Sequence, residues 1–158
     1  YESTFRVVAI VPAPLLCGVP DNLPDEVSMC LRQASSAFWN SPESCAERLR
    51  STVELLLDDQ GIPRNARKAK GGLRHLVLAE RIERAGEKNR RLRDVSDFLS
   101  SIRLFGNAGT HATVDDEIIA EGLQFIQEAL FRVYDPKPSV QELAAKRVKM
   151  GKRAVPKK

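Results

Sequence analysis

The sequence predicts an all-α protein, a bundle of four to five helices with an extended N-terminal arm and a basic C-terminal tail. Of its 158 residues 42% are hydrophobic, which is enough for one domain with an ordinary core. Apolar residues recur at helical spacing over most of the chain, and proline, glycine or capping residues separate the periodic segments. We divide the chain into an arm at 1–22, a helical bundle at 23–135, and a C-terminal helix with its tail at 136–158.

The arm and the first two helices have clear boundary signals. Residues 5–12 are apolar and β-branched, as in a single strand, and four prolines keep 12–24 extended until the first helix begins at the last of them. Ser41 and Pro42 are a typical N-cap and first helical residue, so we expect a second helix from there to the stop signal at Gly61. The apolar positions of the first helix are Val27, Cys30, Leu31, Ala34 and Phe38.

A basic loop and two further helices are predicted next. Residues 61–72 form the loop, 73–85 a short third helix closed by Gly86, and 92–105 a fourth helix. The glycine-rich segment 106–109 ends the fourth helix. Its apolar stripe consists of Val95, Phe98, Leu99, Ile102 and Phe105.

Capping boxes predict the last two helices. Thr113 with Asp116 opens a fifth helix that ends near Tyr134, and Ser139 with Glu142 opens a last helix that continues into the tail. The core side of the fifth helix consists of Ile118, Ile119, Leu123, Ile126, Leu130 and Val133.

Composition excludes several classes of protein. No run of about 18 apolar residues exists, so no membrane-spanning helix is predicted. The cysteines at 17, 30 and 45 form no CxxC pair, and the two histidines are not at ligand spacing, so neither a disulfide framework nor a zinc site is predicted. We therefore expect a cytoplasmic protein without metal or cofactor, in which Cys30 and Cys45 are buried as small hydrophobic residues.

Positive charge is concentrated in the tail. The whole chain has a net charge of +4, but seven of its 25 Lys and Arg residues lie in 146–158, which holds no acidic residue. Residues 1–145 keep 18 basic against 21 acidic residues and are mildly acidic. Such a tail binds RNA or DNA electrostatically, aids solubility, or docks on a partner protein, and the sequence does not choose among these roles. Its central cations are Lys146, Arg147, Lys149, Lys152 and Arg153.

The segment IRLFGNAGTH, 102–111, combines an arginine, an asparagine and a histidine in one short turn. Arg103 lies near the end of the fourth helix, and His111 lies just before the fifth helix, whose free N–H groups attract anions. An arginine that holds a phosphate and an imidazole that transfers a proton are sufficient for metal-free RNA cleavage by the 2′-OH. The alternative is purely structural, because Gly106 and Asn107 are typical turn residues.

A second pair of candidate residues lies on the second helix. Arg50 and Glu54 are four residues apart, so they are expected to face each other on the helix surface. An ordinary surface ion pair is the favoured interpretation.

The order of these segments resembles the bacterial domain of unknown function 4145, over roughly residues 23–135. That family has an Arg-x3-Glu pair on an early helix, matched by Arg50 and Glu54, and an R-x2-GN-x3-H turn. The turn is matched by Arg103, Gly106, Asn107 and His111. The domain occurs alone and in restriction- and phage-defence proteins.

The resemblance implies a branch of the HEPN (higher eukaryotes and prokaryotes nucleotide-binding) superfamily, whose members are helical bundles and often homodimers. Many are metal-independent ribonucleases in which four to six residues separate the catalytic arginine and histidine. Here seven residues separate Arg103 from His111. We therefore favour a non-catalytic interaction or dimerisation module, a homodimer or a subunit of a larger defence complex that could bind RNA, over an endoribonuclease that uses these two residues.

Overall fold

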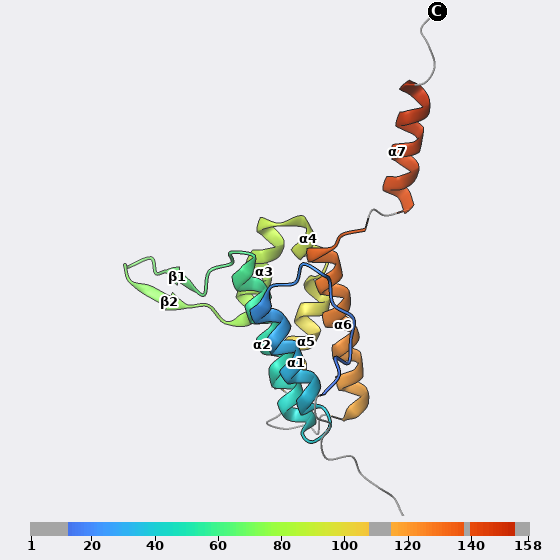
Figure 1. The fold of residues 1–158 in the computed structure, drawn as a ribbon. Helices are drawn as coiled ribbons and strands as arrows, with labels where there is room; N and C mark the ends of the chain where they lie inside the picture. Colours follow the sequence, from blue (N-terminus) through green and yellow to red (C-terminus); the bar gives the residue numbers. More distant parts are fainter. Residues whose placement is uncertain (1–12, 108–114, 138–139, 154–158) are drawn as a thin grey trace, which may run out of the picture.

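The predicted all-α class is confirmed by the computed structural model, which describes residues 13–107, 115–137 and 140–153 (Figure 1). Within these residues, helices dominate and one small two-stranded sheet projects from their side. None of the described helices is long and apolar enough to cross a membrane.

The first two helices, α1 (Asp25–Ala37) and α2 (Pro42–Asp59), form a helical hairpin that matches the predicted boundaries. Ser41 is the N-cap of α2, and its hydroxyl accepts a hydrogen bond from the Ser44 N–H at 3.2 Å. Beyond the other end of α2, Gly61 adopts a φ of +68°, which favours glycine. The predicted N-cap residue and the predicted glycine stop of α2 are therefore both confirmed.

Helices α5 (Ser96–Asn107) and α6 (Asp116–Tyr134) pack against α2 and complete the main core. The predicted capping box at the start of α6 is wrong, because Asp115 is the N-cap and its carboxylate accepts the Ile118 N–H at 2.8 Å. The largest fully buried side chains of these three helices are Leu49, Leu56, Leu57, Leu99, Ile102, Ile119, Ile126 and Leu130.

The predicted third helix at 73–85 and the loop before it are wrong in part. Strands β1 (Asn65–Arg67) and β2 (Leu73–His75) form an antiparallel hairpin, and α3 (Leu78–Lys88) begins only after it. Gly86 does not end α3. It lies buried within the helix, where a Cβ would meet the Cα of Arg93 at 3.5 Å.

The predicted fourth helix is divided in two. A short α4 (Arg90–Arg93) precedes α5, because Asn89 caps the first (its Oδ1 accepts the Arg91 N–H at 2.9 Å) and Ser96 bonds the Arg93 carbonyl at 2.8 Å. The expected break at Gly106 is also wrong by two residues, since α5 continues to Asn107.

The two ends of the described chain differ in how they pack against the bundle. The arm at 13–24 lies against the bundle, where the Leu16 N–H donates to Ser35 of α1 at 3.2 Å and the Asn22 amide donates to the Tyr134 carbonyl of α6 at 2.9 Å. Helix α7 (Val140–Arg153) instead stands away from the bundle (Figure 1). The described side chains of α7, at 143–150, are all exposed. The arm thus belongs to the packed domain, while α7 presents its surface to solvent.

Candidate functional site

The described part of the candidate turn, at the end of α5, lies where α2, α5 and α6 approach closely. A Cβ placed on Gly122 of α6 would lie 3.2 Å from Leu49 Cδ1 of α2 and 3.3 Å from Phe105 Cδ2 of α5. Arg50 follows Leu49, and Arg103 precedes Phe105 by two residues. The close contact at Gly122 therefore places both arginines near the same level of the bundle.

Arg103 has an unusual environment for a residue near a helix end. Its side chain is half-buried, and its Nε is shielded from solvent with no hydrogen-bond partner among the described residues. A buried guanidinium N–H without an acceptor is unfavourable, and guanidinium groups prefer carboxylate or phosphate oxygens. Arg103 is therefore a candidate to hold an anionic group.

The predicted Arg50–Glu54 ion pair is present. Arg50 Nε lies 3.6 Å from Glu54 Oε1, and about a third of each side chain is exposed (34% and 37%). An i, i+4 pair with this exposure contributes at most about 0.5 kcal/mol to stability. The pair orients Arg50 along the surface of α2.

The rest of the candidate turn is only partly described. Gly106 and Asn107 form the last residues of α5, and His111 lies outside the described residues. The convergence of Arg103 and His111 on one phosphate-sized space therefore stays a prediction.

Other reactive groups in the described residues are poorly suited to catalysis. Burial raises the pKa of the Cys17 thiol to about 11 and that of the Cys45 thiol to about 12, so both are protonated at neutral pH. The described residues contain no group of three or more His, Cys, Asp or Glu side chains that could hold a metal ion.

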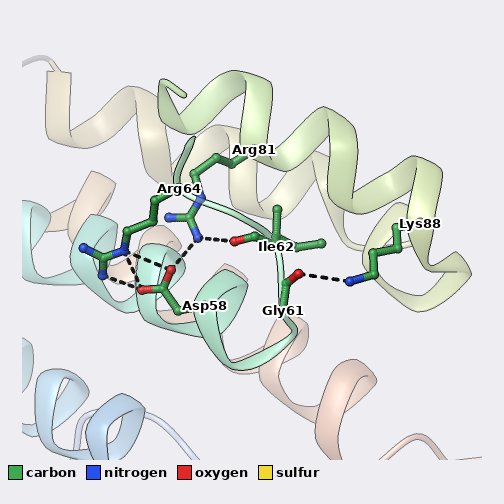
Figure 2. Close-up of polar contacts among 6 residues, drawn as sticks. All are labelled: Asp58, Gly61, Ile62, Arg64, Arg81 and Lys88. Atoms are coloured by element: carbon green, nitrogen blue, oxygen red, sulfur yellow. Dashed lines mark hydrogen bonds and ion pairs between the residues drawn. The ribbon is translucent and has the colours of Figure 1, made fainter. Parts of the chain in front are cut away.

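A polar cluster around the buried Arg81, at the other end of α2, was not predicted from the sequence (Figure 2). Arg81 of α3 is 3% exposed, and its Nη2 donates to Asp58 Oδ1 at 2.6 Å and to the Ile62 carbonyl at 3.0 Å. Arg64 also binds the Asp58 carboxylate, from its Nε at 3.0 Å and from its Nη2. Lys88 donates to the Gly61 carbonyl at 3.0 Å. The cluster joins the end of α2, the start of the hairpin and α3.

Electrostatics in this cluster favour the ionised carboxylate. The hydrogen bond from Arg64 and the charges of Arg81 and Arg64 lower the pKa of Asp58, although burial opposes them. One sequence signal could have revealed the cluster. Arg81 lies on the apolar face of α3, between Leu78 and Ile82, where an arginine needs a counter-charge.

The described part of the basic tail lies on α7. Lys146, Arg147 and Lys149 are exposed on this helix, and Lys152 and Arg153 belong to its last turn, although their side chains lie outside the described set. The cations of α7 are thus presented on a helix rather than on an extended chain.

A family model matches most of the chain. The model of the family described as "Domain of unknown function (DUF4145)" matches residues 32–153. No curated protein and no solved structure matches the chain significantly. The matched segment begins in α1, includes the candidate turn and ends at the last residue of α7, so it extends further toward the C-terminus than the resemblance over 23–135. The chain belongs to the DUF4145 family.

Proposed function

We propose that this chain is a non-catalytic interaction module, a HEPN-like domain of a prokaryotic defence or nucleic-acid-processing system, that associates with a second copy of itself through α7. In a larger defence complex the same helix would hold the subunit in place, and its cations would lie beside bound RNA or DNA. The exposure of α7 is the observation that carries this proposal.

Helix α7 has the properties of a helix that needs a partner. Leu143 is 46% exposed and Met150 is 57% exposed. They are seven residues apart and so share one face. A helix of this length is marginal in water without tertiary contacts. Large apolar side chains on such a helix are usually buried against another surface.

Self-association is expected to depend on that face of α7. In sedimentation velocity, Leu143→Asp should weaken the dimer at least tenfold, because burying one leucine side chain contributes about 1.5–3 kcal/mol. Ala145→Asp is the matched control, since Ala145 is also exposed but lies on the opposite face of α7. A wild-type chain that is monomeric at every concentration, or equal effects of the two variants, would contradict the proposal.

A metal-independent endoribonuclease is the second candidate function, favoured by the unpartnered Nε of Arg103. In that mechanism the substrate 2′-OH attacks the adjacent phosphorus and displaces the 5′-oxygen, which leaves a 2′,3′-cyclic phosphate. His111 would act as general acid or base, and Arg103 would stabilise the charged pentacoordinate state.

We expect no cleavage of single-stranded RNA by the wild-type chain in the presence of EDTA. The assay includes His111→Ala, Arg103→Ala and, as a control, Arg91→Ala, which removes an exposed cation of α4. Circular dichroism and thermal melting establish that each variant is folded. Cleavage that yields 2′,3′-cyclic ends and is lost only in the His111 and Arg103 variants would overturn the non-catalytic proposal in favour of the enzyme.

A further inference from the structure

The β1–β2 hairpin is a basic element that projects from the bundle (Figure 1). Every side chain from 63 to 75 is exposed except Ala66, which is half-buried. The hairpin contributes no buried side chain to the core, and a two-stranded hairpin is only marginally stable alone. The segment 61–75 has no acidic residue, and its cations are Arg64, Arg67, Lys68, Lys70 and Arg74. Its composition therefore indicates a binding role rather than a packing role.

Two of the five cations anchor the base of the hairpin. Arg64, just before β1, binds Asp58 of α2, as Figure 2 shows. Arg74 of β2 binds Glu80 of α3 through two hydrogen bonds, of 2.8 and 2.6 Å. Both sides of the hairpin therefore contact helices of the bundle at its base.

The other three cations have no such partner. Arg67, Lys68 and Lys70 make no side-chain hydrogen bond or ion pair with any described residue, and all three are exposed. Arg67 is the last residue of β1, and the two lysines belong to the turn. Three unneutralised positive charges therefore stand together at the outer end of the hairpin.

The turn has a defined backbone shape. The Gly71 N–H donates to the Lys68 carbonyl at 3.0 Å, and the Lys68 N–H donates to the Gly72 carbonyl at 3.0 Å. Gly71 and Gly72 have φ values of +86° and +83°, with nothing within 4 Å of a Cβ at either position. Glycine is therefore favoured at both positions by the backbone conformation and not by close contacts with neighbouring atoms.

One face of the hairpin also carries polar and apolar side chains that are free to make contacts. Arg67 pairs with Leu73 and Asn65 pairs with His75 in the strand register, so these four residues share a face. An amide and an imidazole are groups that hydrogen-bond base edges, whereas a protein interface usually has aromatic residues or methionine at its centre. The composition of this face favours nucleic acid over an acidic protein.

We propose that the β1–β2 hairpin enters the major groove of duplex DNA and that Arg67, Lys68 and Lys70 contact its phosphates. A two-stranded ribbon fits the major groove of B-form DNA, while the deep and narrow major groove of duplex RNA does not admit one. Lysine and arginine contacts to phosphate give affinity that is independent of sequence and sensitive to salt. The proposal concerns a site separate from α7 and does not require self-association.

The test is fluorescence anisotropy with a short mixed-sequence DNA duplex at several salt concentrations, using the full chain. The variant Arg67→Gln/Lys68→Gln/Lys70→Gln is compared with Arg32→Gln/Arg90→Gln/Arg91→Gln, which removes the same charge from exposed positions on α1 and α4. A third variant, Lys146→Gln/Arg147→Gln/Lys149→Gln, tests the cations of α7. Circular dichroism verifies the fold of each.

We expect the hairpin variant to bind at least tenfold more weakly and its slope of log K against log salt to be shallower by about 2–3, because each phosphate contact contributes about 0.9 to the slope. The control variant should lose much less. Failure of the wild-type chain to bind, equal losses in hairpin and control variants, or loss only in the α7 variant would overturn the proposal. Binding of an RNA duplex of the same sequence as tightly as DNA would also overturn it, as would equal competition by polyglutamate, which would indicate an acidic protein partner.

Discussion

Replacing Asp58 with alanine is expected to lower the free energy of unfolding by about 3 kcal/mol, because it leaves a buried arginine without its counter-charge. Arg81 is 3% exposed and donates to Asp58 at 2.6 Å. Its remaining described acceptor is the Ile62 carbonyl, which carries no net charge. The variant also releases Arg64, but that side chain is exposed and can be hydrated. The loss therefore comes mainly from Arg81.

Urea unfolding followed by circular dichroism measures this effect. Glu83→Ala is the control, since it removes an exposed carboxylate from α3 and should change stability by less than about 0.5 kcal/mol. The double variant Asp58→Ala/Arg81→Met should be more stable than Asp58→Ala alone, because no unpaired charge stays buried. Equal stability of Asp58→Ala and Glu83→Ala would show that Arg81 does not depend on Asp58.

The pH dependence of stability is a second measurement of the interaction between Asp58 and Arg81. The hydrogen bond from Arg64 and the charge of Arg81 lower the pKa of Asp58 in the folded state, so its contribution is present above the unfolded pKa of about 3.9 and is lost as the pH falls through the folded value. The hydrogen bond from Arg74 lowers the pKa of Glu80 to about 2 in the same way. The stability difference between wild type and Asp58→Asn should therefore shrink below about pH 4.

Local signals predicted the parts of the fold that depend on nearby residues. Ser41 and Pro42 mark the start of α2 because an N-cap bond spans only three residues, and Gly61 follows its end because the backbone turns left-handed there. The stripe at Val95, Leu99 and Ile102 is buried as predicted. These features can be predicted without knowing which residues distant in the sequence are in contact.

The sequence analysis missed the hairpin and the polar cluster around Arg81. Both depend on contacts with residues that are distant in the sequence. Leu73 and Leu76 are three residues apart, a spacing that places them on one side of a helix, so the pattern favoured a helix from 73 onward. Pairing with residues 65–67 instead holds 73–75 as a strand. Arg81 finds its partner 23 residues away, a distance that no local pattern specifies.

For the candidate turn, the sequence predicted the position of Arg103 but not the environment of its side chain. The sequence predicted Arg103 near the end of a helix, in a turn on which the resemblance to the DUF4145 family was based. It did not predict that Arg103 would be half-buried with a shielded Nε, because that depends on how α2, α5 and α6 pack around it. A motif identifies a family more readily than it specifies the environment of each side chain.

Gly122→Leu is expected to destabilise the protein by about 3 kcal/mol, because the added side chain overpacks the contact between α2, α5 and α6. Even a Cβ at this position would lie 3.2 Å from Leu49 and 3.3 Å from Phe105. Neither neighbour can move aside easily, since Leu49 is fully buried and Phe105 stacks on Phe125 with ring centroids 6.2 Å apart. To fit a leucine, the helices themselves have to separate.

Gly86→Ala is the matched control for this effect. It also lies inside a helix and is buried, but its Cβ would meet Arg93 at an ordinary 3.5 Å, so the gain in helix propensity should raise stability by about 0.5–1 kcal/mol. If packing at Gly122 is tight, urea unfolding should give a lower free energy of unfolding than wild type for Gly122→Leu and a higher one for Gly86→Ala. If Gly122→Leu instead matched wild type, the junction would be loose. Arg50 and Arg103, which lie beside it on α2 and α5, would then not be held in a fixed relation, and neither anion binding nor RNA cleavage could rely on their placement.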